Sequence, residues 1–88
     1  MARKPKGHPQ LEVKLYSQFN VYFEGGAESV SGVNESGNFD ILPHHANFFT
    51  LLLPGEVRIV SQGQDYVYTV SRGVVHVTEN QVKVFVDI

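Results

Sequence analysis

Two adjacent histidines, His44 and His45, are the first residues of this sequence that could do chemistry. Imidazole nitrogens bind zinc and other transition metals. Neighbouring side chains of an extended segment point in opposite directions, however, so the two rings cannot easily chelate one ion. A metal site would need His8 or His76, together with carboxylates brought in by the fold. We therefore interpret the pair as surface or turn histidines and expect no bound metal.

Nucleophilic and acid–base catalysis also find little support in the sequence. None of the six serines lies on the strand-to-helix turn that exposes a hydrolase nucleophile, and the chain has no cysteine. Carboxylate pairs such as Glu24 with Glu28, or Glu35 with Asp40, fit solvated turns better than an acid and base pair. Gly25-Gly26 opens no helix whose N-terminus could hold a phosphate. The sequence predicts no catalytic residue, no cofactor and no small-molecule substrate.

The charge distribution argues against nucleic acid as a partner. Three of the seven basic residues lie before residue 11, and from Leu11 onward four basic residues stand against nine acidic ones, a net charge of −5. A surface that acidic binds phosphates poorly. Aromatic residues could form a base-stacking platform, but they lack flanking basic residues. We predict instead that the following phenylalanines belong to the core: Phe23, Phe39, Phe48, Phe49 and Phe85.

The pattern of apolar residues indicates strands throughout. The chain has fourteen valines and only three alanines, and β-branched residues favour pleated sheets over helices. Apolar and polar residues alternate with a period of two in most segments, and Gly, Asn or Pro separates them. We expect strands at residues 11–16, 19–24, 28–33, 39–41, 48–53, 56–59, 66–71, 75–78 and 82–86.

Three features refine this expectation. Pro43 lacks an N–H, so Leu42-Pro43 should mark a corner after the strand at 39–41. The run at 48–53 is almost wholly apolar, which predicts a strand buried on both faces, with a single helical turn as the alternative. Turns at 62–65 and at Glu79-Asn80 predict two hairpins in the last third of the chain.

The fold class that follows is all-β, a small β-sandwich or flattened barrel of eight or nine short strands. Residues 11–88 form this single domain, and residues 1–10 are expected to be a flexible basic tail. No apolar run approaches the ~20 residues of a membrane-spanning helix, so we expect a cytosolic or peripheral protein.

The segment from Gly37 to Leu51 resembles a motif of the epsilon subunit of bacterial F-type ATP synthase, which is called delta in mitochondria. It reads Gly-Asn-Phe-Asp-Ile-Leu-Pro-His-His-Ala-Asn-Phe-Phe-Thr-Leu, against Gly-x-Phe-Gly-Ile-Leu-Pro-Gly-His-Ala-Pro-Leu-Leu-Thr in the family. The segments 53–59, 71–77 and 82–87 are similar to further motifs of that family. The resemblance covers residues 11–88 in order, without large gaps.

This resemblance implies a flattened β-sandwich of about ten strands and a non-catalytic place in the rotor. The family's domain lies at the foot of the central stalk, peripheral to the cytoplasmic face of the bacterial membrane. It contacts the gamma subunit and the membrane c-ring, and it couples ion transport to ATP synthesis. The ring-facing loop of the family falls on Asn38 and on His44, His45 and Ala46. The alternative is a stand-alone β-sandwich adaptor.

The sequence departs from the family in several places. Asp40 stands where the family usually has glycine, Asn47 where it usually has proline, and Arg72 where it usually has the first glycine of a pair. Asp40 tolerates unusual backbone angles, whereas Arg72 must point outward. The family's C-terminal helical hairpin, which inhibits ATP hydrolysis, has no counterpart in these 88 residues, so we expect none of that regulation here.

Overall fold

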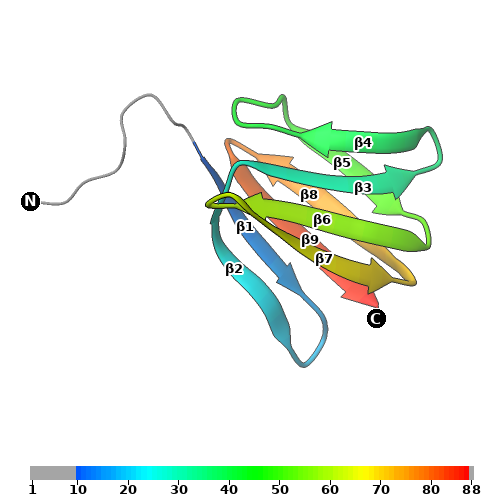
Figure 1. Cartoon of the computed structure of the whole chain (residues 1–88). Helices are drawn as coiled ribbons and strands as arrows, with labels where there is room; N and C mark the ends of the chain where they lie inside the picture. Colours follow the sequence, from blue (N-terminus) through cyan, green and yellow to red (C-terminus); the bar gives the residue numbers. More distant parts are fainter. Residues whose placement is uncertain (1–9, 88) are drawn as a thin grey trace, which may run out of the picture.

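The computed structural model describes residues 10–87, which form nine strands in two facing sheets (Figure 1). This confirms the all-β sandwich predicted from the sequence. The described residues include no helix that could cross a membrane. The predicted tail, apart from Gln10, lies outside the described residues. The strands are β1 (Leu11–Tyr16), β2 (Val21–Ala27), β3 (Ser29–Asn34), β4 (Gly37–Ile41), β5 (Phe48–Leu52), β6 (Gly55–Ser61), β7 (Gln64–Val70), β8 (Arg72–Thr78) and β9 (Gln81–Asp87).

The five-stranded sheet, here called sheet A, has the order β2-β1-β9-β8-β5, and the four-stranded sheet B has the order β4-β3-β6-β7. Neighbouring strands are antiparallel with one exception. The first strand, β1, runs parallel to the last, β9, with Leu15 opposite Val84. The two ends of the folded domain therefore lie side by side in sheet A (Figure 1).

Two tight turns confirm the predicted hairpins. Glu79 and Asn80 connect β8 to β9 with φ angles of 51° and 67°, and Gln62 and Gly63 connect β6 to β7 with 53° and 77°. Two consecutive left-handed residues match the right-handed twist of the flanking strands. The second of these turns is shorter than the predicted 62–65, because β7 already begins at Gln64.

The core lies between the inner faces of the sheets. Alternate residues of most strands point inward, as the period of two predicts. In β9, for example, the valines are buried while the residues between them are exposed. The buried apolar residues are Leu11, Val13, Leu15, Ala27, Val30, Ile41, Leu52, Val57, Ile59, Val70, Val75, Val77, Val82, Val84 and Val86.

Aromatic pairs close the two open sides of the sandwich. On one side Phe39 of β4 packs against Phe48 of β5, with ring centroids 5.6 Å apart. On the other side Phe23 of β2 meets Tyr66 of β7 at 5.2 Å, and the Tyr68 hydroxyl donates to the Tyr22 carbonyl at 3.2 Å. These contacts shield the core where no strand pairing joins the sheets.

The structure corrects two expectations about buried residues. Strand β5 is not buried on both faces: it is an edge strand of sheet A, and Phe49 and Leu51 on its outer face are 65% and 62% exposed. Phe49 and Phe85 are likewise not core residues. Nothing in the described chain covers the outer face of sheet A, so an apolar residue there stays in contact with solvent. Phe23, Phe39 and Phe48 do pack against the core as predicted.

The second strand also differs from its prediction. Phe19 lies in the loop before β2 and is 85% exposed, and β2 continues past Gly25-Gly26 to Ala27. Gly25 has a φ of 155° and pairs with Val13, and the register with β1 continues without a bulge through Gly26 to Ala27.

Candidate docking surfaces

The histidine loop, defined here as residues 42–47, joins β4 to β5 across the two sheets. Strand β4 ends just before Leu42-Pro43, as the missing N–H of proline predicts. The next residue, His44, has a left-handed backbone with a φ of 67°. Its amide donates a hydrogen bond to Oδ1 of Asn80 at 2.6 Å, and the His45 amide donates to the Leu42 carbonyl at 3.1 Å. The loop is therefore a defined turn.

The His45 ring is held within this loop. Its Nδ1 lies 2.7 Å from the Ala46 carbonyl oxygen, and the ring meets Phe48 edge to face with centroids 5.3 Å apart. A carbonyl oxygen can only accept, so Nδ1 must carry the proton of this hydrogen bond. In the neutral ring Nε2 is then left as an acceptor.

The conformation of the histidine pair differs from the extended segment that the sequence suggested, because His44 is left-handed. Among residues 10–87 no group of three or more His, Cys, Asp or Glu side chains lies close enough to hold a metal ion. His45 and His44 thus contribute polar groups to a surface turn.

Asn38 lies apart from the other candidate residues. His44, His45 and Ala46 are consecutive in the loop, whereas Asn38 is in β4, paired with Val33, with its side chain exposed. Three residues of extended chain, about 10 Å, separate Asn38 from the end of β4 at Ile41. The structure therefore brings three of the four candidates together and places the fourth at the other end of one strand.

A second surface, which the sequence reasoning missed, lies on the outer face of sheet A. One residue from each strand, directly opposite its neighbours, forms a continuous line across all five strands, here called the apolar row. Residues paired in this way have Cα atoms about 5 Å apart, so their side chains are in contact. The apolar row, from β2 to β5, consists of Val21, Tyr16, Phe85, Val74 and Leu51.

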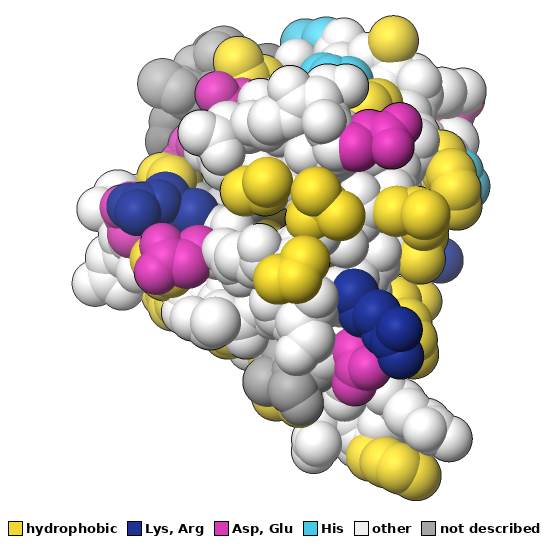
Figure 2. Space-filling view, turned by 90° about the vertical axis from the view of Figure 1, so that its right-hand side faces the viewer, with side chains coloured by type: hydrophobic (Ala, Val, Ile, Leu, Met, Phe, Trp, Pro, Cys, Tyr) yellow, Lys and Arg dark blue, Asp and Glu magenta, His cyan; other side chains and the backbone are white. Residues whose placement is uncertain are grey.

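Much of the apolar row is open to solvent. Leu51, Val21 and Phe85 are 62%, 54% and 42% exposed. Three residues of the row, Phe85, Val74 and Leu51, line a groove together with Phe19 of the β1–β2 loop and Leu53. Figure 2 looks onto the right-hand end of the molecule as drawn in Figure 1, where hydrophobic side chains gather beside a pair of oppositely charged side chains.

One signal in the sequence could have indicated the apolar row. Phe85 stands between the buried Val84 and Val86, at a position that the alternation assigns to the outer face beside Lys83 and Asp87. A single exposed aromatic residue is ordinary at a protein surface, so Phe85 gains meaning only beside the other residues of the row. The row itself cannot be read from the sequence, because it needs the order and the register of all five strands.

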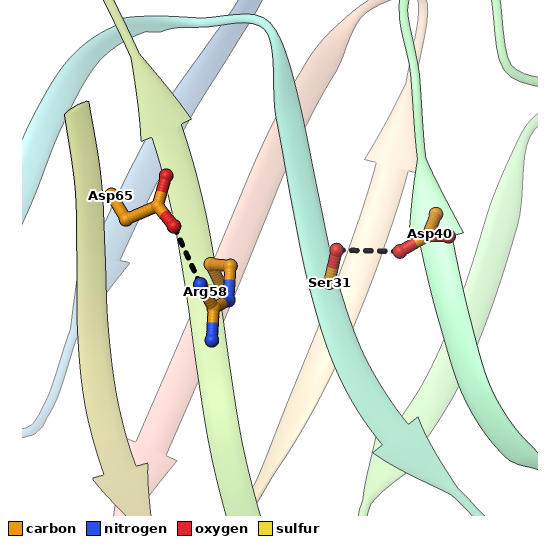
Figure 3. Close-up of polar contacts among 4 residues, drawn as sticks. All are labelled: Ser31, Asp40, Arg58 and Asp65. Carbon is orange, nitrogen blue, oxygen red and sulfur yellow. Dashed lines mark hydrogen bonds and ion pairs between the residues drawn. The ribbon is translucent and has the colours of Figure 1, made fainter. Parts of the chain in front are cut away.

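Sheet B presents a different outer face, with polar side chains linked to one another (Figure 3). The Ser31 hydroxyl donates to the Asp40 carboxylate at 2.6 Å, and Arg58 binds Asp65 at 2.5 Å. Asp40, where the resembling family has glycine, sits in regular β4 pairing opposite Ser31 and needs no unusual backbone angle. Arg72 points outward as predicted, with its side chain 79% exposed, and binds Asp87 on sheet A at 3.4 Å.

Within residues 10–87, one ionisable group has a shifted pKa. Burial, and secondarily the neighbouring Tyr66, raise the pKa of the Tyr68 phenol above its usual 10.0. This tyrosine closes one side of the sandwich through its hydrogen bond to Tyr22. Its shift therefore belongs to packing between the sheets.

Comparison with protein families gives one match to nearly the whole chain. The family described as ATP synthase, Delta/Epsilon chain, beta-sandwich domain matches residues 10–88. An ATP synthase epsilon chain of Nitratiruptor sp. is 32% identical over 78 residues, covering 88% of this chain and 60% of the relative. One from Legionella pneumophila is 41% identical over 68 residues, covering 75% and 48%. The chain thus spans about half the length of these relatives.

Solved structures share the fold. A chain in the Euglena gracilis mitochondrial ATP synthase structure, comprising OSCP, F1 and c-ring, superposes with a TM-score of 0.82 at 20% identity. The match covers 93% of this chain and 54% of that one. A chain in the Tetrahymena thermophila structure of the central stalk and c-ring gives a TM-score of 0.78 at 18% identity, covering 89% and 63%.

Proposed function

Because the chain belongs to the family of the ATP synthase delta/epsilon chain β-sandwich domain, we propose that it is a non-catalytic rotor subunit of an F-type ATP synthase. In this role it joins the gamma subunit to the membrane c-ring at the foot of the central stalk. It turns with both and so couples ion transport to ATP synthesis. Its location is then peripheral, at the cytoplasmic face of a bacterial membrane.

The observation that carries this proposal is the separation of two surfaces along one stiff domain. The histidine loop is hydrogen-bonded through the His44 amide to Asn80, which comes just before β9. The apolar row crosses β9 at Phe85. Five residues of strand, about 16 Å, separate these points. In Figure 1 the loop between β4 and β5 and the carboxyl end of β9 lie toward opposite ends of the molecule. Such an arrangement suits a part that joins two neighbours and transmits torque between them.

The gamma subunit is assigned to the apolar row. A rotor contact must persist through every turn, and long-lived interfaces bury a more apolar centre than transient ones. Tyr16 and Phe85 offer aromatic anchors of the kind that dominate binding energy. Arg72 and Asp87, paired beside the row, provide a polar rim.

The c-ring is assigned to the histidine loop. His44, His45 and Ala46 present backbone and imidazole groups that suit the polar loops of a membrane ring. Asn38 is assigned to the same interface, where it contacts the ring from the β3–β4 end of β4. The ring contact is polar and narrow, so we expect it to be weaker than the contact with gamma.

Binding to the two purified partners tests the proposal. The chain is immobilised and exposed to the gamma subunit, to detergent-solubilised c-ring, and to both together. We expect each to bind alone, and gamma to be retained on the ring better when the chain is present. If neither partner binds, the proposal is wrong and a stand-alone adaptor becomes the better interpretation.

A further inference from the structure

Asn80 connects three segments that are distant in the sequence. As the second residue of the β8–β9 turn, it has a left-handed φ of 67°. Its backbone carbonyl accepts a hydrogen bond from the Glu12 amide of β1 at 2.8 Å. Its side-chain Oδ1 accepts the His44 amide at 2.6 Å. One residue therefore joins a hairpin turn of sheet A, the start of β1 and the histidine loop.

Among the described residues, the hydrogen bond from His44 to Asn80 is the one that ties the histidine loop to another segment of the chain. Within residues 10–87, the other hydrogen bonds of the loop are internal, from His45 to the carbonyls of Leu42 and Ala46. The left-handed backbone of His44 is itself uncommon for a residue with a Cβ. A short hydrogen bond at its amide stabilises that conformation, and it fixes where the loop stands relative to sheet A.

We propose that Asn80 is a positioning residue, which holds the histidine loop in the conformation that it presents to the c-ring. This inference rests on the ring contact proposed above. Asn80 acts through His44, since its Oδ1 is occupied by the His44 amide, and His45 follows directly in the same turn. Without the bond, the loop keeps its internal contacts but loses its anchor on the β8–β9 turn.

The turn offers a matched pair of variants. Asn80→Gly removes the acceptor and keeps the turn, because glycine adopts a left-handed backbone freely. Asn80→Asp keeps both the acceptor and the tolerance for this backbone. Glu79→Gly is the control, since Glu79 has a φ of 51° in the same turn and does not contact His44.

Two measurements on the full chain test the inference. Amide hydrogen exchange of His44, followed by NMR, should be about tenfold faster in Asn80→Gly than in wild type, and should be unchanged in Glu79→Gly and Asn80→Asp. Affinity for detergent-solubilised c-ring should fall about three- to tenfold in Asn80→Gly and be restored in Asn80→Asp, while affinity for gamma stays the same.

The outcomes separate this inference from the function on which it rests. If His44 exchange in Asn80→Gly matches that in Glu79→Gly, Asn80 does not hold the loop and the inference is overturned. The inference is also overturned if His44 amide exchange rises in Asn80→Gly while its affinity for the c-ring equals that of Glu79→Gly. If the wild-type chain itself fails to bind the ring, the proposed function fails, whatever the exchange rates show.

Discussion

Tyr16 and Phe85 meet edge to face on the outer face of sheet A, with ring centroids 5.3 Å apart and ring planes at 70°. The two residues come from the first and last strands, which pair in parallel in the middle of the sheet. Each contributes an aromatic side chain at a position that faces away from the core. The pair is the aromatic part of the apolar row, which we propose as the surface that binds gamma.

Phe85→Glu tests the assignment of the apolar row to gamma. The substitution places a carboxylate at the centre of the proposed interface, where burial without a partner is costly. We expect the affinity for gamma to fall at least about tenfold, measured by biolayer interferometry. Lys83→Glu, two residues earlier on the same face of β9, is the control and should change gamma binding by less than about threefold. Equal losses in both variants would contradict the assignment.

His45→Glu tests the assignment of the histidine loop to the c-ring. The change removes the imidazole from Phe48 and adds a negative charge to an acidic domain, so ring binding should weaken about tenfold. The loss of the contact between the His45 imidazole and Phe48 should lower the melting temperature by only a few degrees. His76→Glu changes another exposed histidine, outside the loop, and should leave ring binding intact. An unfolded His45→Glu chain would show that the loop is part of the core.

Gly73→Ala tests the packing between β8 and its neighbours. A Cβ on Gly73 would meet the Phe85 carbonyl oxygen, with Leu52 and Val86 side-chain carbons at 3.1 and 3.2 Å. Because backbone cannot yield as a side chain can, we expect the free energy of unfolding to fall by about 1–3 kcal/mol in urea titrations. Ser71→Ala, at an exposed neighbouring position, should change it by less than about 0.5 kcal/mol. An unchanged free energy of unfolding in Gly73→Ala would mean that β8 and its neighbours can move apart at little cost.

Alkaline pH should destabilise the sandwich through Tyr68. The folded state raises the pKa of this phenol above 10.0, so the unfolded chain loses its proton first. The stabilising contribution is complete below pH 10 and is lost as pH rises through the folded pKa. Tyr68→Phe should therefore show a shallower decline of the free energy of unfolding above pH 10 than wild type. Identical slopes would show that the phenol titrates alike in both states.

Local patterns in the sequence determined the strands and several of their ends. The alternation at 82–86 predicted an inward row of valines, and Glu79-Asn80 predicted a two-residue turn, because side-chain direction and turn geometry depend on neighbours in the chain. Pro43 predicted the end of β4 for the same reason. The all-β class followed from these local rules.

Two expectations about which strand faces are covered were wrong. An apolar run such as 48–53 has the same pattern whether one or two faces of its strand are covered. Phe49 is exposed because it lies on the outer face of sheet A, which nothing in the described chain covers. The prediction that Phe85 is a core residue rests on the lack of flanking basic residues, which says nothing about the face of β9 on which it lies. Hydrophobicity measures the tendency to leave water, but the strand order decides which face has something to pack against.

By itself, then, the sequence determined the β-sandwich and identified His44, His45 and Ala46 as neighbours in one exposed turn. Only the tertiary structure decided that Asn80 anchors this turn and that five strands align an apolar row. The physical reason is that both depend on contacts between segments distant in the sequence, and the parallel pairing of β1 with β9 is the longest-range example. It joins the two ends of the domain, and no local pattern encodes a contact between residues so far apart in the chain.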